Sequence, residues 1–350
     1  MFDASIKQIV KAHFPGETLD KAVRMQGGVS ADVYKLQLSA EGAPARDLVL
    51  RIHGQTHGGH PAGLEFQLLQ FAYDAGLPVQ TPVLVDTSCT HLPAPYLIVS
   101  YVDGTTEISE GNLDETLGVM ARVMFALHAT STKALPDLPE RTDPIPDLIG
   151  FLPSTEENQA FRAWLEALKS APYAGALVPL HGDFWPGNLV WQGDCLAAIL
   201  DWEDAAIGDP LSDVACTCLE LRYLFGGAVM QRFADAYRAH APIDPERLTL
   251  WLAYVSAAAL RYMGDWRLAP DREAHMRKEA LATLKEARTA LGTQSGMTLT
   301  VHLDGNQIGK DGVGADGSEI EIGHIGMANM DVFTEIIGQR FRVIISEHGS

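Results

Sequence analysis

The stretch that decides the fold is His181-Gly182-Asp183-Phe184-Trp185-Pro186-Gly187-Asn188, followed by Ile199-Leu200-Asp201-Trp202-Glu203. It places Asp183 and Asn188 on one expected loop, and it places Asp201 at the end of the apolar run 196–200. Phosphoryl transfer from a nucleotide requires such a set: one carboxylate orients the attacking hydroxyl, while an amide and a second carboxylate hold Mg²⁺ on the phosphates. A structural alternative is that Asp183 caps a turn and Asn188 bonds the loop backbone. The three residues together favour the chemical interpretation.

Protein kinases carry a related pattern, in which His-Arg-Asp is followed after four residues by Asn and later by Asp-Phe-Gly. Here Gly182 stands in the place of the Arg, and Asp201-Trp202-Glu203 stands in the place of Asp-Phe-Gly. With these differences the chain resembles the aminoglycoside phosphotransferase and choline kinase family of small-molecule kinases. The resemblance covers the chain from about Gly27 to about Ala290. It includes Leu127-His128-Ala129 and Gly208-Asp209-Pro210-Leu211-Ser212-Asp213.

The resemblance implies an α+β, two-lobed protein-kinase-like fold with a β-rich N-lobe and a helical C-lobe. The pattern of apolar residues agrees with this fold. After an initial helix, runs of β-branched residues or of alternating apolar and polar residues predict strands at 33–38, 48–52 and 96–102, and helical spacing of apolar residues predicts a helix at 63–75. Further helices are expected at 113–129, 161–170, 211–225, 229–240, 245–262 and 271–291. We expect an N-lobe over 1–103 that binds the nucleotide and a C-lobe over 104–294 with the catalytic loop and substrate site. We also expect an appended β-rich tail over 295–350, with strands at 297–303, 319–322 and 341–345. The sequence assigns this tail no role.

The resemblance also implies roles for the residues of the catalytic segment. Asp183 would be the catalytic base, and Asn188 and Asp201 would ligate Mg²⁺ through oxygen. His181 would brace the loop by hydrogen bonding. Asp213 resembles the acid that supports this loop from beneath through backbone N–H groups. Glu203 either reaches a second metal or a substrate ammonium, or is an exposed side chain without a role.

The nucleotide is expected to contact two segments of the N-lobe. Glycines let backbone N–H groups approach phosphate oxygens, and a serine hydroxyl adds a donor; the candidates are Gly27, Gly28 and Ser30. A plain hairpin turn is the alternative for this segment. The segment 100–104 resembles the hinge between kinase lobes. There the backbone of Ser100 and Val102 would pair with the adenine edge, and Val99 would face the nucleotide.

Arg51 is a departure from the kinase pattern, because it takes the place of the strand lysine that holds the α- and β-phosphates. Arginine keeps the charge and binds phosphate through two N–H groups, although its reach and geometry differ from those of lysine. We therefore interpret Arg51 as the phosphate clamp and Glu65, on the following helix, as its ion-pair partner. The alternatives are a surface pair without function, or Lys35 in the preceding strand as the clamp.

Two other clusters have alternative interpretations. The motif His53-x3-His57-x2-His60 is either a metal site or part of a loop over the nucleotide. Trp251, Tyr254 and Trp266 either form a cage for a methylated ammonium or pack in the core of the helical lobe.

Composition is that of an ordinary globular protein: 350 residues, 47% hydrophobic and 20% charged. There is no run of 18 apolar residues and no basic segment followed by an apolar one at the N-terminus, so a cytoplasmic location is expected. The four cysteines form no Cys-x2-Cys pair and are expected to be free thiols. The net charge of −19 argues against nucleic-acid binding. It is compatible with a cationic substrate, and also with a surface that is acidic for solubility.

The predicted function is transfer of the γ-phosphate of ATP, or of GTP, to a hydroxyl of a small molecule with Mg²⁺ as cofactor. An aminoglycoside, or a similar amino-sugar or amino-alcohol, is the expected acceptor. One alternative is a metabolic kinase of the choline, sugar or homoserine type. The other is a nucleotide-binding regulatory module without turnover, which Arg51 and the tail motivate. Neither a nucleic acid nor a membrane is expected as a partner, and the tail is a candidate for pairing two copies of the chain.

Overall fold

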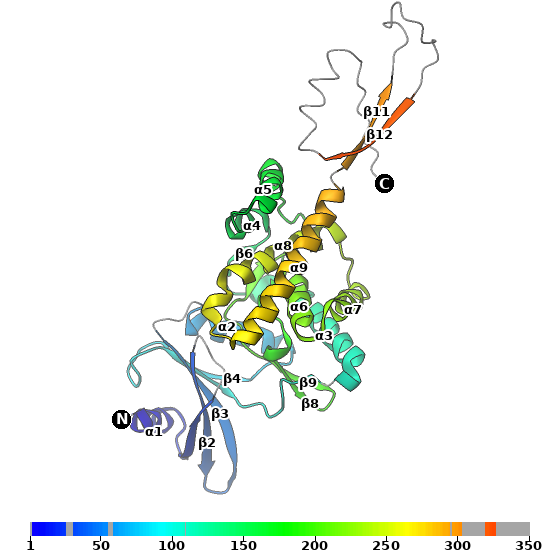
Figure 1. The fold of residues 1–350 in the computed structure, drawn as a ribbon. Coiled ribbons are helices and arrows are strands. Elements are labelled where there is room, and N and C mark those ends of the chain that lie inside the picture. Colours follow the sequence, from blue (N-terminus) through cyan, green and yellow to red (C-terminus); the bar gives the residue numbers. More distant parts are fainter. Residues whose placement is uncertain are drawn as a thin grey trace, which may run out of the picture. The chain divides into compact units, whose positions relative to one another are not determined.

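The computed structural model describes residues 2–25, 31–54, 59–108, 110–294, 296–302 and 319–326. Figure 1 shows the helices and strands of the chain, which divides into two compact units. The first comprises Met1–Thr142, Pro172–Asp244 and Gly264–Met276, and the second Asp143–Ala171, Pro245–Met263 and the chain from Arg277 on. Gly27, Gly28, Ser30 and His57 lie outside the described residues, as does the strand expected at 341–345.

A five-stranded antiparallel sheet forms the N-terminal part of the first unit. Its strands follow the order β1-β2-β3-β5-β4, with the bounds β1 Glu17–Arg24, β2 Ala31–Ala40, β3 Ala43–His53, β4 Pro82–Asp86 and β5 Tyr96–Ser100. The three strands expected from the sequence correspond to β2, β3 and β5. The prediction lacked β1 and β4, which are the two edge strands.

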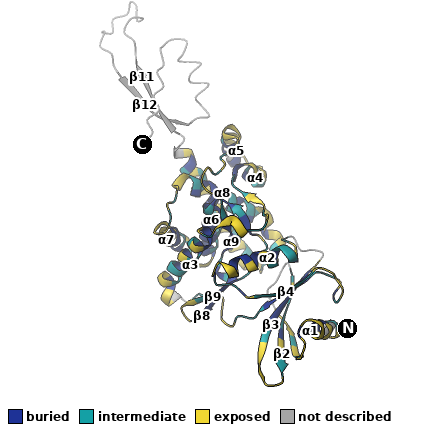
Figure 2. Cartoon of the chain, turned by 180° about the vertical axis from the view of Figure 1, so that it is seen from behind, coloured by how far each residue is buried: buried dark blue, intermediate teal, exposed yellow. Residues whose placement is uncertain are grey.

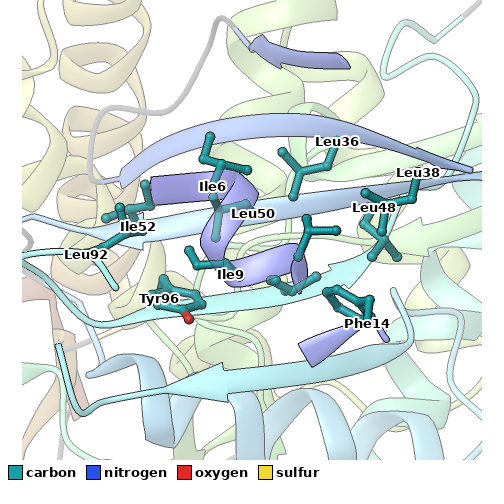
Figure 3. Close-up of a cluster of buried hydrophobic side chains, with 12 residues drawn as sticks. Ile6, Ile9, Phe14, Leu36, Leu38, Leu48, Leu50, Ile52, Leu92 and Tyr96 are labelled. Atoms are coloured by element: carbon teal, nitrogen blue, oxygen red, sulfur yellow. The ribbon is translucent and has the colours of Figure 1, made fainter. Parts of the chain in front are cut away.

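Strand β3 presents different side chains to the two faces of this sheet, because side chains alternate along a strand. Leu48, Leu50 and Ile52 belong to an apolar cluster with residues of helix α1 (Phe2–His13), which covers that face. Figure 3 shows Ile6 and Ile9 of α1 pointing into this cluster.

The opposite face of β3 carries Arg51 and His53, and both contact Glu65 of helix α2 (Ala62–Asp74). Glu65 is on the buried side of α2 together with Leu68 and Ala72, whereas the other side of the helix is exposed (Figure 2). The expected helix at 63–75 agrees with α2 to within one residue at each end. The sheet therefore has one apolar face under α1 and one face that carries a buried ionic group.

The rest of the first unit is mostly helical. Its helices are α3 Leu113–His128, α6 Pro210–Phe225 and α7 Gly227–Arg238. A three-stranded sheet has the order β6-β10-β7, and β8 and β9 form a hairpin; the bounds are β6 Glu140–Arg141, β7 Val178–Leu180, β8 Leu189–Gln192, β9 Cys195–Ile199 and β10 Ala206–Gly208. Helix α6 begins as the sequence predicts, with Asp209 as N-cap accepting from the Leu211 N–H at 2.9 Å and Pro210 at the first position.

The second unit contains α4 Ile145–Phe151, α5 Glu156–Leu168, α8 Pro245–Tyr262 and most of α9, which spans Pro270–Gln294. Its apolar cluster joins these helices through residues such as Leu148, Leu165, Ala253 and Leu284. Strands β11 (Gly296–His302) and β12 (Glu319–Gly326) pair antiparallel where the sequence predicts a β-rich tail. The domain boundaries at 103/104 and 294/295 stay a prediction. Across the described ranges, no helix combines the length and the apolar character needed to cross a bilayer.

Candidate active site

The segment between β7 and β8 brings two of the predicted residues into direct contact. A single 3₁₀ turn, Pro186–Asn188, carries Asn188 back toward Asp183. The Asn188 Nδ2 donates to the backbone oxygen of Asp183 at 3.0 Å and to its Oδ2 at 2.9 Å. The Leu200 N–H donates to the Asn188 backbone oxygen at 2.8 Å, so the turn also positions the residue that precedes Asp201.

Asp213, at the start of α6, supports this segment from beneath. Its carboxylate is fully buried and accepts from the His181 N–H at 2.8 Å and from the Gly182 N–H at 2.9 Å. The His128 Nε2 lies 3.3 Å from the same carboxylate. Burial alone would raise the pKa of Asp213, but the contacts with His128 and with the loop outweigh burial and lower the pKa. Asp213 is therefore an ionised acceptor that holds two consecutive backbone groups of the loop.

His181 is a fully buried brace in the same segment. Its Nδ1 accepts from the Asp183 N–H at 3.2 Å, so its Nε2 carries the proton that is donated to the Leu200 backbone oxygen at 2.9 Å. The imidazole ring also lies edge-on to the indole of Trp202, with 4.8 Å between the ring centroids. Burial lowers the pKa of His181, which agrees with a neutral ring that joins the loop to the strand before Asp201.

The structure explains why glycine occupies position 182. Gly182 has a φ of +84°, a conformation that side-chain-bearing residues rarely adopt. A Cβ atom there would lie 2.0 Å from the backbone oxygen of Asp204. An arginine, as in the protein kinase pattern, does not fit this backbone.

Asp201 follows β9 and is held in an unusual conformation. Its φ is 62°, which costs a non-glycine residue about 1 kcal/mol or more. The Arg51 Nη2 donates to the Asp201 Oδ1 at 2.9 Å, and the Arg51 Nη1 lies 3.1 Å from the Glu65 Oε1. The expected ion pair between Arg51 and Glu65 is thus present, and Arg51 extends it to Asp201.

Two members of this ionic group are buried, whereas the Asp201 side chain is 33% exposed. Side-chain exposure is 11% for Arg51 and 1% for Glu65. Burial would lower the pKa of Arg51, but the carboxylates of Glu65 and Asp201 outweigh it and raise the pKa. Lys35, the alternative clamp, instead contacts Asp47 at 2.8 Å and lies over the ring of Tyr101.

The electrostatics around Asp183 are dominated by negative charge. Burial and the neighbouring carboxylates of Asp204 and Asp201 raise the pKa of Asp183 to about 7, against a smaller opposing effect of the Asn188 hydrogen bond. Glu203 adds to the repulsion. Its Oε2 lies 3.8 Å from the Arg51 Nη2. This concentration of carboxylates favours a cation between them.

The segment predicted as a hinge begins at the end of β5. Val99 is fully buried in the sheet. The Ser100 N–H donates to the Thr81 backbone oxygen at 2.9 Å, and the Ser100 backbone oxygen accepts from the Gln80 Nε2 at 2.8 Å. The Ser100 N–H is therefore engaged within the protein, whereas its carbonyl oxygen keeps a second lone pair. Val102 lies outside the strand and is half-buried.

The histidine motif is not gathered into one site among the described residues. The His53 Nε2 lies 3.1 Å from the Glu65 Oε2, whereas the His60 Nε2 lies 2.7 Å from the Ala205 backbone oxygen. The His60 N–H donates to the Glu203 backbone oxygen at 3.1 Å, so the end of the loop after β3 lies against 203–205.

Two of the aromatic residues considered as a cage contact each other within the second unit. Trp251 is 1% exposed and meets Tyr254 edge-on within the second unit. Trp266 belongs to the first unit. Burial of Trp251 agrees with the core-packing alternative.

Four residues at the site were not assigned a role from the sequence. His128 contacts Asp213 and also the hydroxyl of Tyr237, at 2.8 Å from its Nδ1. Arg141 donates to the backbone oxygens of Gly182 and Asp204, each at 3.4 Å. Asp204 raises the pKa of Asp183. Only His128 left a signal in the sequence, because it belongs to one of the segments that carry the resemblance.

Comparisons with known proteins identify the family of the chain. The sequence model of the Phosphotransferase enzyme family matches residues 21–251. The chain is 23% identical over 253 residues to mouse Acyl-CoA dehydrogenase family member 10, covering 66% of this chain and 23% of that protein. The chain thus spans about a quarter of the length of the curated relative that it matches.

Solved structures share the fold at low identity. A putative aminoglycoside phosphotransferase from Ralstonia eutropha has a TM-score of 0.63 at 16% identity, covering 82% of this chain and 98% of that one. A ternary complex of the aminoglycoside phosphotransferase APH(4)-Ia with AMP-PNP and hygromycin B has a TM-score of 0.58 at 18% identity, covering 80% and 98%. Macrolide 2'-phosphotransferase type I has a TM-score of 0.55 at 17% identity, covering 79% and 96%.

These likenesses confirm the expected kinase-like fold, with a β-rich N-terminal sheet and a helical C-terminal part. Since the family model matches more than half of the chain, the protein belongs to the Phosphotransferase enzyme family.

Proposed function

We propose that the chain transfers the γ-phosphate of ATP, in a Mg²⁺-dependent reaction, to a hydroxyl of a small cationic molecule of the aminoglycoside, amino-sugar or amino-alcohol class. The observation that carries the proposal is the convergence of Asp183, Asn188 and Asp201 with the buried Arg51–Glu65 pair. Family membership supports the reaction class. The acceptor class is supported by structural neighbours that are aminoglycoside phosphotransferases, one of which was solved as a complex with hygromycin B.

The residues present fit a magnesium ion. The Asn188 Nδ2 is engaged by Asp183, so the side-chain oxygen of Asn188 is the atom left for a cation. Arg51 occupies the Asp201 Oδ1, which leaves its Oδ2. Oxygen ligands of this kind are those that Mg²⁺ prefers. Asn188 and Asp201 would hold the ion, whose chemistry is to neutralise charge on the phosphates.

Arg51 fits a phosphate ligand as well. Its Nε is buried and has no hydrogen-bond partner among the described residues, which is unusual for a buried donor. Its two terminal nitrogens are fixed by Glu65 and Asp201. We assign Arg51 to the α- and β-phosphates, with Glu65 fixing its orientation.

Asp183 would accept the proton of the attacking hydroxyl and hold that hydroxyl in line with the phosphate. Its backbone N–H is fixed by His181 and its carboxylate by Asn188, so its position is set by the loop that Asp213 supports. Glu203 and the carboxylates near it would favour a substrate ammonium over a neutral group.

We also propose contacts of the nucleotide with the hinge segment and with the glycine-containing segment of the N-terminal part. Adenine would donate to the Ser100 backbone oxygen and accept from the Val102 N–H, and Val99 would face the nucleotide. Gly27, Gly28 and Ser30 would contact the phosphates. The choice of ATP is supported by neighbours solved with AMP-PNP and with ADP. Pairing of two copies through 295–350 and a cytoplasmic location also stay predictions.

A coupled assay of ADP release tests the function. The purified chain is given Mg-ATP or Mg-GTP and a panel of hydroxyl-bearing compounds: aminoglycosides, choline, homoserine, neutral sugars and a macrolide. We expect one cationic acceptor to stimulate ADP release, and the Asp183→Asn variant to lose at least about 100-fold of that rate. Mass spectrometry of the acceptor checks that it gains one phosphate.

The panel also separates the alternatives. Stimulation by choline, homoserine or a neutral sugar alone would replace the proposed acceptor class with a metabolic one. A regulatory module would bind nucleotide but show no acceptor-dependent release, and its basal rate would be equal in the wild-type chain and in Asp183→Asn.

A further inference from the structure

A second cluster of metal-ligating side chains lies in the N-terminal part of the first unit, away from the residues described above. His13 ends helix α1, Asp86 ends the edge strand β4, and His91 lies in the loop between β4 and β5. Each offers one ligand atom, and the three atoms lie within 4.8 Å of one another. In the described part of the chain, no other group of three histidine, cysteine, aspartate or glutamate side chains has its ligand atoms this close together.

The carboxylate of this cluster is held in place by its neighbours. The Asp86 Oδ2 accepts from the Tyr96 hydroxyl at 2.9 Å, and the Asp86 Oδ1 accepts from the Ser88 N–H at 2.7 Å and the Ser88 hydroxyl at 2.6 Å. Tyr96 is fully buried in the apolar cluster under α1, where Figure 3 shows its hydroxyl at the border of the labelled side chains. Hydrogen bonds from such supporting groups orient a carboxylate ligand and leave lone pairs for an ion.

The two imidazoles are brought together from distant parts of the sequence. Their rings lie edge to face, with centroids 5.7 Å apart. The loop that carries His91 turns sharply at Cys89, which has a φ of 55°, and the Ser88 hydroxyl lies 2.7 Å from that of Thr90. His13 is fixed at its backbone by α1, whose Ile9 and Val10 pack on the sheet.

The donor set selects the class of ion. Two imidazole nitrogens and one carboxylate oxygen suit Zn²⁺ and similar transition metals, whereas Mg²⁺ and Ca²⁺ prefer oxygen alone. At Zn–N and Zn–O distances near 2.1 Å, two ligands of one ion are at most about 4.2 Å apart. The three ligand atoms lie within 4.8 Å of one another, so any pair farther apart than this limit closes when the ion binds.

We propose that His13, Asp86 and His91 bind one Zn²⁺ ion per chain, with solvent in the fourth position. Bound there, the ion joins the end of α1 to the edge strand β4 and so fixes the N-terminal helix on the sheet. Its role is structural, and it is independent of the proposed phosphotransfer.

Zinc titration of the full chain tests this. The protein is stripped with a chelator, and its affinity for Zn²⁺ is measured by competition with a chromophoric chelator. We expect one site with a dissociation constant below about 1 µM, well within the range of protein zinc sites. His13→Gln and His91→Gln each weaken binding by at least about 10-fold, since even loss of a group that only supports a ligand has that effect. Addition of Zn²⁺ raises the Tm of the wild-type chain by about 5 °C and raises the Tm of His13→Gln by less at the same Zn²⁺ concentration.

Three control variants make the result specific. Cys89→Ser removes an exposed thiol from the same loop, His240→Gln removes an exposed histidine elsewhere, and Asp201→Asn removes a carboxylate from the candidate active site. All three are expected to keep wild-type zinc affinity. Equal affinity in the wild-type chain and His13→Gln, loss of the site in Cys89→Ser or in Asp201→Asn, or absence of zinc binding would each overturn the proposal.

Discussion

Arg51 and Asp201 lie 150 positions apart in the chain and meet through a 2.9 Å hydrogen bond from Nη2 to Oδ1. The same guanidinium contacts Glu65 through Nη1 at 3.1 Å. One planar side chain thus links β3, α2 and the segment that follows β9. The two terminal nitrogens of Arg51 thus form a fork that contacts two carboxylates. A lysine has a single ammonium group and cannot reproduce this fork.

The fork predicts a defect in nucleotide binding when arginine is replaced by lysine. We expect Arg51→Lys to raise the KM for ATP about 10-fold, equivalent to about 1.4 kcal/mol, because one of the two carboxylates loses its partner. Initial rates at varied ATP measure this. Arg46→Lys is the matched control, since Arg46 is an exposed residue that pairs with Glu17. An unchanged KM in Arg51→Lys would mean that the fork does not position the nucleotide.

Asp213 predicts a pH-dependent stability. Its folded pKa lies below the ordinary value, which is about 4, so its contribution is fully present above that ordinary pKa and is lost as pH falls through the folded pKa. Asp213→Asn is expected to lower the free energy of unfolding by about 3 kcal/mol at pH 7. The deficit relative to wild type shrinks as pH falls below about 4.

Urea denaturation of both proteins at pH 7, 5, 4 and 3 would measure this trend. Asp137→Asn serves as the control because Asp137 is exposed, and it should match wild type throughout. A deficit of Asp213→Asn that stays constant from pH 7 to pH 3 contradicts a lowered pKa of Asp213 in the folded state.

Gly182 predicts a steric effect that can be separated from backbone strain. Gly182→Ala places a Cβ 2.0 Å from the Asp204 backbone oxygen and requires a side chain at a φ of +84°. We expect it to destabilise the protein by about 2–4 kcal/mol and to abolish most of the transfer activity. Gly193→Ala is the control, since it shares a positive φ of +59° but meets nothing within 4 Å; about 1 kcal/mol and full activity are expected. Equal effects of the two substitutions would refute the steric argument.

The sequence predicted those elements whose pattern is local. Helix α8 has the expected bounds, Pro245–Tyr262, and α6 differs from expectation by one residue. The strands that escaped prediction, β1 and β4, lie at the edges of the sheet. Edge strands are only partly buried, so charged residues interrupt their alternation, as in β1. Short β6, β7 and β10 leave too few residues for any period to be visible.

The candidate site was predictable to the extent that its residues are close in sequence. Asp183 and Asn188 belong to one motif, and Asp201 follows the strand next to it. The contact of His128 with Asp213 joins positions 85 apart, and nothing in the residue types specifies that pairing. The same holds for Arg141, whose contacts are with backbone oxygens. Long-range contacts of this kind depend on the packing of whole elements and leave no periodic signal.

The central claim is that Asn188 and Asp201 hold a divalent ion beside Asp183. Binding of Mn²⁺ in the presence of AMP-PNP, followed by electron paramagnetic resonance, tests it most directly. We expect Asp201→Asn and Asn188→Ala to weaken Mn²⁺ binding at least about 10-fold. Asp183→Asn is expected to bind the ion and the nucleotide but to transfer phosphate at least about 100-fold more slowly. Wild-type Mn²⁺ affinity in Asp201→Asn would contradict the account.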